Sequence, residues 1–258
     1  MIIPNAPTGV SPGITFSNTN VLRGLTPTIT DAGVNQTPSN ITDPDHSLTY
    51  TSGVNASDFA VSFGAVENIS YVGISGHTLA TLNLGTIQLF DGELLVDTVT
   101  LERNNNVMFT FDLMSFTDLK VKFLVSPSNA AITVSYICAG ESMLITQGEQ
   151  AGYKRGWLNR PLTQSTIGGV NGAPVSTLSK RKALSMSISL PYTSVGLSRG
   201  FWQRFLDYAE KEPFFVKEVI DLPESSYICY DQAPDFSAHS QTRVLDTFKM
   251  KFTAYNGL

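Results

Sequence analysis

Residues 86–100 of the chain read TIQLFDGELLVDTVT, and this stretch decides the fold class. Two short runs rich in apolar and β-branched residues, 86–90 and 94–100, flank the pair Asp91-Gly92. An Asp-Gly pair between two such runs is a strong hairpin signal, because a type I′ turn needs positive φ at both central positions. The stretch therefore predicts an antiparallel β-hairpin in a mainly β protein.

Further strand candidates surround this hairpin between residues 51 and 145. In one of them, Leu119–Val125, lysines alternate with valine and phenylalanine, so that one face is apolar and the other mostly polar. The other candidates are Ile69–Ile74, Val107–Leu113 and Ala131–Ala139. Short strands at this spacing predict a jelly-roll β-sandwich over residues 51–145.

Residues 146–258 follow a different pattern. Apolar residues alternate with serine over Leu184–Leu190, which predicts a half-buried strand, and a helical stripe predicts one helix that begins near Ser198 and ends before Pro213. The stretch 146–180 shows no sustained period and contains several glycines, so we expect a long loop or an extended hairpin there. Residues 146–258 are therefore expected to form an antiparallel α+β domain with one helix.

Residues 1–50 are rich in proline, threonine, asparagine and glycine, which predicts an arm and irregular connections with at most short strands. The chain has 258 residues, 42% of them hydrophobic, which suffices for one large core or two ordinary ones, and we expect two. Cys138 and Cys229 each lie in an apolar or aromatic run, so we expect free thiols in the core. No secretory signal and no run of about eighteen apolar residues is visible, which favours a soluble protein made in a cytoplasm.

Enzyme chemistry finds little support in the residues. The three histidines, His46, His77 and His239, lie in no nucleophile motif, and the chain has no Gly-x-Ser-x-Gly, P-loop or dinucleotide fingerprint. The formal net charge of -5 offers no broad basic surface for nucleic acid. We therefore expect neither an enzyme nor a cofactor.

Two groups of acidic residues could in principle serve a metal site or a glycosidase. The run Asp43–His46 collects three possible metal ligands, but no glycine or distal glutamate completes a calcium loop, so a turn with solvated carboxylates is the favoured interpretation. A pair of carboxylates such as Asp91, Glu93 or Asp112, facing across a groove, would suit a glycosidase. Nothing in the sequence singles those residues out, and we predict no metal site.

The basic residues are concentrated in residues 151–182, which carry six basic and no acidic side chains. One interpretation is an interface with an acidic neighbour, such as the acidic N-terminal region of another copy, or with phosphate passing nearby, because aromatic residues are interleaved with the charges. The other is solubility of an exposed loop. The interface interpretation selects Tyr153, Lys154, Arg155, Trp157, Arg160, Lys180, Arg181 and Lys182.

The order of segments resembles known protein families. Residues 71–79 (YVGISGHTL), followed by short strands ending in YICAG at 136–140, resemble a galactose-binding-like, discoidin-type jelly roll. The stretches Arg160–Leu162, Leu184–Leu190, Phe201–Trp202, Pro213–Val216 and Thr247–Tyr255 resemble tail proteins of long-tailed bacteriophages, of the distal tail or tail-tip adaptor type. This resemblance implies a sheet-and-helix domain that joins copies into a ring around the tail axis. Galactose-binding-like domains in general bind sugars through loops at one end, but no sugar-binding triplet can be matched here.

These observations together predict a non-enzymatic virion protein, a tail subunit that forms a homo-oligomeric ring. Its expected partners are other copies of itself, other tail proteins of the tube, hub or fibre, and host surface glycan, without free nucleic acid or membrane insertion. Its expected location is the virion tail after synthesis in the bacterial cytoplasm. The alternatives are a carbohydrate-binding module for host glycans and a neck or capsid-decoration protein.

Overall fold

The computed structural model describes residues 14–30, 37–53, 58–81, 85–125, 131–145, 162–168, 174–181, 184–194, 202–219, 221–236 and 245–255. Antiparallel strands dominate these residues, accompanied by one α-helix and two short 3-10 helices, η1 (Pro38–Thr42) and η2 (Leu79–Thr81). The expected mainly β class is confirmed. None of the helices in these stretches is long and apolar enough to cross a membrane.

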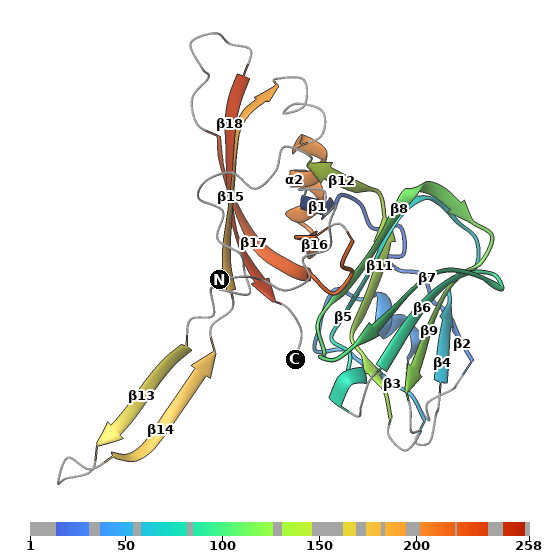
Figure 1. Cartoon of the computed structure of the whole chain (residues 1–258), viewed down its shortest axis with the longest axis horizontal. Coiled ribbons are helices and arrows are strands. Elements are labelled where there is room, and N and C mark those ends of the chain that lie inside the picture. The colour runs from blue at the N-terminus through green and yellow to red at the C-terminus, as the bar shows by residue number, and fades with distance from the viewer. Residues whose placement is uncertain are drawn as a thin grey trace, which may run out of the picture.

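One half of the molecule is a β-sandwich (Figure 1). Its first sheet has the strand order β2 (Thr28–Ile29), β4 (Asp58–Ser62), β9 (Leu119–Val125), β6 (Gly85–Asp91) and β7 (Leu94–Leu101). The second has the order β11 (Tyr136–Gly140), β5 (Val66–Ser75) and β8 (Val107–Phe116), and a short pair joins β10 (Thr133–Val134) to β3 (Tyr50–Thr51). Alternate residues of both sheets meet in one buried core, as the sequence pattern predicted.

The hairpin predicted at residues 86–100 is present, as strands β6 and β7, but its turn differs from the expected type. Asp91 pairs with Leu94, so the two loop residues are Gly92 and Glu93. Gly92 has φ +60°, and among the described non-glycine residues only Asn68 has positive φ. Positive φ at the first central position alone is the pattern of a type II′ turn, which needs glycine there and accepts glutamate next.

The other half is a six-stranded antiparallel sheet with one helix. Its strand order is β12 (Ser142–Ile145), β1 (Ile14–Ser17), β16 (Phe214–Lys217), β17 (Ser226–Phe236), β18 (Leu245–Tyr255) and β15 (Leu184–Ser194). Helix α2 (Gln203–Ala209) buries Phe205, whose ring meets Phe16 and Phe214 edge to face at centroid distances of 5.4 and 5.0 Å. The helix is confirmed over this range, and Ser198 lies outside the described residues.

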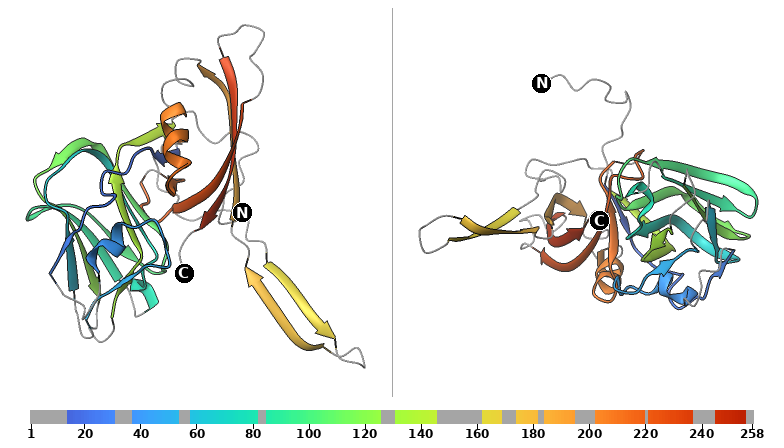
Figure 2. Two further views of the ribbon diagram at one scale, coloured as in Figure 1. Left: turned by 180° about the vertical axis from the view of Figure 1, so that it is seen from behind. Right: turned by 90° about the horizontal axis from the view of Figure 1, so that it is seen from below.

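The first fifty residues contribute to both halves. Strand β1 pairs with β12 on one side and with β16 on the other. Leu22 and Ile41 are fully buried in the core of the sandwich. Because β1 precedes the sandwich and β12 follows it, the sandwich is inserted into the six-stranded sheet through two connections (Figure 2).

The two halves meet in a buried seam. Strand β16 is buried along its whole length, because Phe214 and Val216 face the helix side while Phe215 faces the sandwich. The sandwich contributes Tyr71, Met108, Tyr136 and Cys138 to this seam, and the sheet contributes Phe215 and Ile228. The seam is tight, since a Cβ on Gly73 would lie 2.8 Å from two ring carbons of Phe215.

Polar contacts reinforce the seam. The Nδ2 group of Asn106 donates to the backbone oxygen of Tyr255 at 2.5 Å, and the hydroxyl of Ser226 donates to the backbone oxygen of Asn106 at 2.9 Å. The hydroxyl of Ser75 donates to Oδ1 of Asn106 at 2.8 Å. Asn106 is fully buried, and an unsatisfied amide there would be costly, so these bonds fix one relative position of the two halves.

Candidate assembly interface

Two of the predicted interface residues lie on a β-hairpin. Strands β13 (Leu162–Gly168) and β14 (Pro174–Arg181) pair in antiparallel register, from Leu162 opposite Arg181 to Gly168 opposite Pro174. Lys180 and Arg181 are the last two residues of β14. The other predicted residues lie outside the described residues: Tyr153, Lys154, Arg155, Trp157, Arg160 and Lys182.

This hairpin extends away from the rest of the molecule. Its two strands form a sheet of their own and pair with no other described strand. Figures 1 and 2 place it on the far side of the six-stranded sheet from the sandwich, pointing outward in each view. A single two-stranded hairpin is at best marginally stable in water.

The stretch of sequence that includes the hairpin and the stretch that forms most of the sandwich carry opposite charge. Residues 151–182 carry six basic and no acidic residues, whereas residues 51–145 carry nine acidic and three basic ones. Residues 51–145, which hold most strands of the sandwich, therefore have a formal charge of -6, from 3 minus 9, and residues 151–182 have +6. Opposite charges on surfaces of separate copies favour association and set its orientation.

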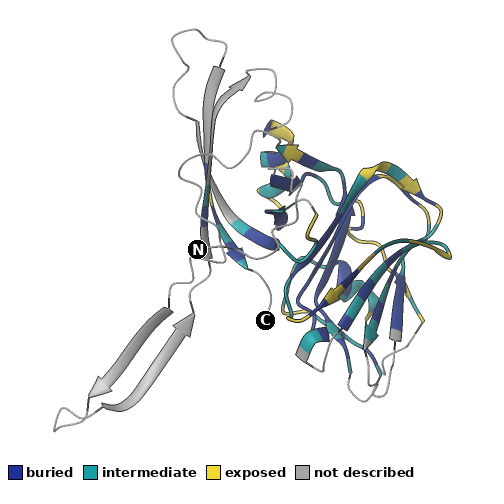
Figure 3. Ribbon diagram, viewed as in Figure 1, coloured by how far each residue is buried: buried dark blue, intermediate teal, exposed yellow. Residues whose placement is uncertain are grey.

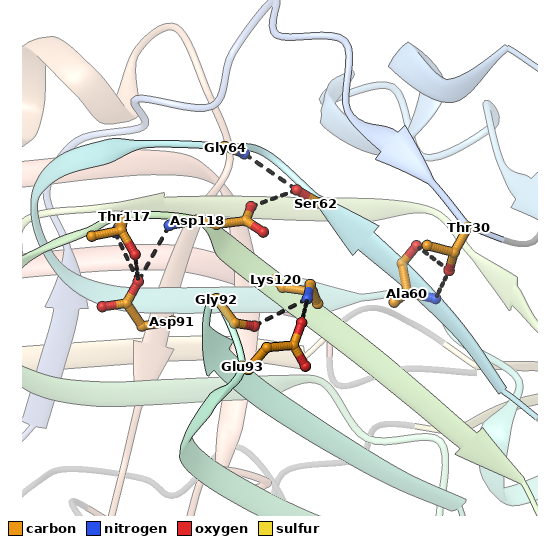
Figure 4. Close-up of polar contacts among 10 residues, drawn as sticks. All are labelled: Thr30, Ala60, Ser62, Gly64, Asp91, Gly92, Glu93, Thr117, Asp118 and Lys120. Carbon is orange, nitrogen blue, oxygen red and sulfur yellow. Dashed lines mark hydrogen bonds and ion pairs between the residues drawn. The ribbon is translucent and has the colours of Figure 1, made fainter.

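The turns at one end of the sandwich are joined by a polar network, drawn in Figure 4. Oδ1 of Asp91 accepts hydrogen bonds from the backbone and hydroxyl of Thr117, both at 2.7 Å, and from the backbone N–H of Asp118. The bonds from Thr117 lower the pKa of Asp91. Lys120 donates to the backbone oxygen of Gly92 and to the carboxylate of Glu93 at 2.9 Å. Asp91 and Glu93, considered above for a glycosidase, thus tie the turns together.

The histidines also serve local structure where they are described. Nε2 of His77 lies 2.7 Å from the backbone oxygen of Asn105, and burial lowers the pKa of His77 to about 4. Its side chain is 1% exposed, and this contact holds it in place after β5. His239 lies outside the described residues.

The acidic run near His46 forms two side-chain turns. Oδ1 of Asp43 accepts from the backbone N–H of Asp45, and Oδ1 of Asp45 accepts from that of Ser47. The ring of His46 lies 5.6 Å from that of Tyr136 and 5.8 Å from that of Tyr230, at the seam. No group of three or more potential metal ligands occurs in the part of the chain that the structure describes.

One set of surface residues was missed from the sequence. Leu94, Leu95 and Leu113 lie on β7 and β8 of the sandwich and are among its most exposed large apolar residues. A signal was present, because the adjacent pair Leu94-Leu95 breaks the alternation expected of a strand with one buried face. Each of these two strands is the last strand of its sheet.

Comparison with known proteins gives matches to solved structures over about half of the chain. A fucose-binding module of Streptococcus pneumoniae matches with 17% identity over 48% of this chain and 95% of that one, at a TM-score of 0.38. The lectin-binding domain of lectinolysin, in complex with Lewis b, matches with 13% identity over 49% and 99%, at 0.39. Chitosan-binding module 1 of a chitosanase/glucanase from Paenibacillus sp. IK-5 matches with 14% identity over 47% and 98%, at 0.36. No protein-family model and no curated protein matches the chain.

Proposed function

We propose that this protein is a non-catalytic assembly subunit whose projecting hairpin binds a neighbouring copy of the chain. The observation that carries this proposal is the hairpin β13–β14, which extends outward without pairing to any other described strand. Its isolation in one copy contrasts with the tightly packed seam, which holds the two halves as one body. Such a subunit consists of one packed body, the two halves joined at the seam, and one projecting element, the hairpin.

The direction of the hairpin favours a head-to-tail contact. It points away from the acidic sandwich of its own copy in both Figure 1 and Figure 2. A contact from one surface of a copy to a different surface of the next is heterologous, and it generates a closed ring or an open filament. In a closed ring every hairpin binds a neighbouring copy and every receiving surface is occupied, so we expect a ring.

The tail of a long-tailed bacteriophage is our proposal for where this ring is built. The support comes from the resemblance of segments in residues 160–255 to distal tail and tail-tip adaptor proteins. In that setting the ring surrounds the tail axis, the sandwich is displayed on the outside, and the further partners are tube, hub or fibre proteins. The protein is then synthesised in the host cytoplasm and ends in the virion.

The second candidate function is recognition of surface glycan by the sandwich. It follows from the two-sheet sandwich itself, since the resemblance in residues 71–140 is to galactose-binding-like domains, which in general bind sugars through loops at one end. The matched solved structures are named for fucose, Lewis b and chitosan binding. A fold hosts many functions, so this candidate assigns no residues, and a glycan array with fucosylated and chitosan ligands tests it.

The assembly proposal is tested by removing the hairpin. A variant in which residues 162–181 are replaced by a short Gly-Ser linker loses the reaching element and keeps both cores. We expect the full-length chain to form oligomers in analytical ultracentrifugation and the variant to sediment as a monomer. Thermal unfolding is the control, because the variant should melt with the same main transition. Oligomers that persist in the variant would contradict the proposal.

A further inference from the structure

The sandwich exposes three leucines on two of its strands. Leu94 and Leu95 open β7 and are 71% and 46% exposed, and Leu113 in β8 is 60% exposed. A single exposed leucine is ordinary on a protein surface, but several large apolar residues exposed close together mark an interaction site. Figure 3 shows exposed residues along both of these strands.

Strands β7 and β8 border the same open side of the sandwich. Each is the last strand of its own sheet in the described topology, and a short connection joins the end of β7 to the start of β8. At one end Asp91, beside β7, accepts hydrogen bonds from Thr117, just after β8. The two strands thus run in opposite directions along one edge.

A second anchor fixes their relative position further along. Lys217 donates to the hydroxyl of Thr110 on β8 at 2.9 Å. Burial lowers the pKa of Lys217 to about 8, and the nearby charge of Asp97 on β7 opposes this shift. Leu94 lies midway between Asp91 and Asp97 in the chain, and Leu113 lies between Thr110 and Thr117. Leu94 and Leu113 therefore lie at a similar height along β7 and β8, between the two contacts that hold these strands together.

Both strands are irregular at that level. In β7, Val96 has no opposite residue, because Leu89 pairs with Asp97 and Phe90 pairs with Leu95. In β8, the three residues 111–113 face the single residue Ser70, between the pairs Tyr71–Thr110 and Ile69–Met114. Bulges of this kind bend an edge and hinder the addition of another strand. A partner at this edge is therefore expected to bind through side chains.

The charges around the leucines select the partner. Glu93, whose side chain is 96% exposed, precedes Leu94, and Asp112 and Asp97 are the acidic neighbours along the two strands. An apolar patch with an acidic border fits a basic segment that also carries aromatic and aliphatic residues. Residues 151–182 have this composition, with six basic residues and Tyr153, Trp157, Leu158 and Leu162 among them.

We infer that the edge formed by Leu94, Leu95 and Leu113, with Asp112 and its acidic neighbours, receives the 151–182 segment of a second copy of this chain. The hairpin of the same copy points away from this edge (Figure 1), which leaves the edge to a neighbour. The inference rests on the proposed assembly function and names the receiving surface. It makes the contact heterologous, with the basic hairpin as donor and the leucine edge as acceptor.

The test measures oligomer dissociation of the full chain by mass photometry and sedimentation velocity. The double variant Leu94→Ser/Leu113→Ser should weaken association about tenfold or more, the effect of losing interface anchors worth at least about 1.4 kcal/mol. Leu144→Ser is the matched control, because Leu144 is 49% exposed but lies on β12 of the other half. The control should associate as the unaltered chain does.

A charge exchange provides an independent readout. Asp112→Lys should weaken association, and the same change combined with Lys180→Glu and Arg181→Glu should restore part of it, because opposite charges then face each other again. Asp112 is exposed, so this variant retains the fold even if the serine variant does not. Unchanged association of Asp112→Lys and of a folded leucine variant would overturn the inference. If removal of the hairpin still dissociates the oligomer in that case, the proposed function stands and only the receiving surface is wrong.

Discussion

A methyl group added at Gly73 should push the two halves of the molecule apart. Gly73 lies in the middle strand β5 between Cys138 of β11 and Met108 of β8, and its added Cβ would meet Phe215 at 2.8 Å. Carbon atoms in good contact are about 3.5–4.0 Å apart, so one side must yield by about 0.7–1.2 Å. Phe215 is held in place, since its backbone N–H donates to the hydroxyl of Ser17 at 2.8 Å.

We therefore expect Gly73→Ala to destabilise the protein by about 1–3 kcal/mol, the usual cost of overpacking a filled core. For a chain of this size that corresponds to a fall of about 2–12 °C in Tm. Differential scanning calorimetry measures it, and the double variant Gly73→Ala/Phe215→Leu provides the check. If the aromatic ring of Phe215 causes the loss of stability, the smaller leucine should recover part of it, with a coupling energy of about 1 kcal/mol. An unchanged Tm in Gly73→Ala, or strictly additive effects in the double variant, would refute the described packing of the seam.

Two titrating side chains give further predictions. Burial lowers the pKa of Lys217 from 10.5 to about 8, so the unfolded chain binds more protons between these values and stability should rise as the pH increases from 8 to 10.5. We expect the Lys217→Met variant to be more stable than the unaltered protein at pH 7 and to gain less stability between pH 7 and pH 10. Urea unfolding of both proteins at the two pH values measures this, and an equal pH dependence would contradict the lowered pKa of Lys217. Burial likewise lowers the pKa of His77 from 6.5 to about 4, so stability should fall as the pH drops from 6.5 towards 4. His77→Gln, which keeps a donor for the Asn105 oxygen, should lose part of this acid sensitivity in urea unfolding at pH 4.5 and 7, and an undiminished loss would contradict burial of a neutral imidazole.

Local sequence patterns predicted the strands well, because the signal for a strand lies in its own residues and in the turn next to it. The β6–β7 hairpin needed only the turn Asp91-Gly92 and two short apolar runs. The turn type was wrong because the cross-strand pair Asp91–Leu94 moves the loop by one residue, and register depends on packing across the sandwich. The domain limits at residues 50 and 145 remain predictions.

The seam could have been suspected from continuous apolar runs but not located. YVGIS at 71–75, YICAG at 136–140 and FFVK at 214–217 do not alternate between apolar and polar residues. Such runs indicate strands with both faces buried, yet the sequence does not say what covers the second face. Their meeting depends on β1, which pairs with β12 and β16 over long separations in the chain. No local pattern encodes such pairings.

The candidate interface was predicted in part for similar reasons. The charge of residues 151–182 predicted an interface segment, and its contact with a partner stays a prediction. Their lack of a sustained period predicted a long loop or an extended hairpin, and strands β13 and β14 form a hairpin. The receiving edge was missed because Leu94, Leu95 and Leu113 are typical core residues in sequence. Only the end of each sheet at β7 and β8 leaves them exposed.

The central claim is that copies of this chain bind one another, and the molecular mass of the purified protein tests it most directly. Light scattering coupled to size-exclusion chromatography, over a range of concentrations, should give an oligomer, and the proposed ring predicts a mass above that of a dimer. Negative-stain electron microscopy of that peak should then show rings. A monomer mass at every concentration would contradict the account.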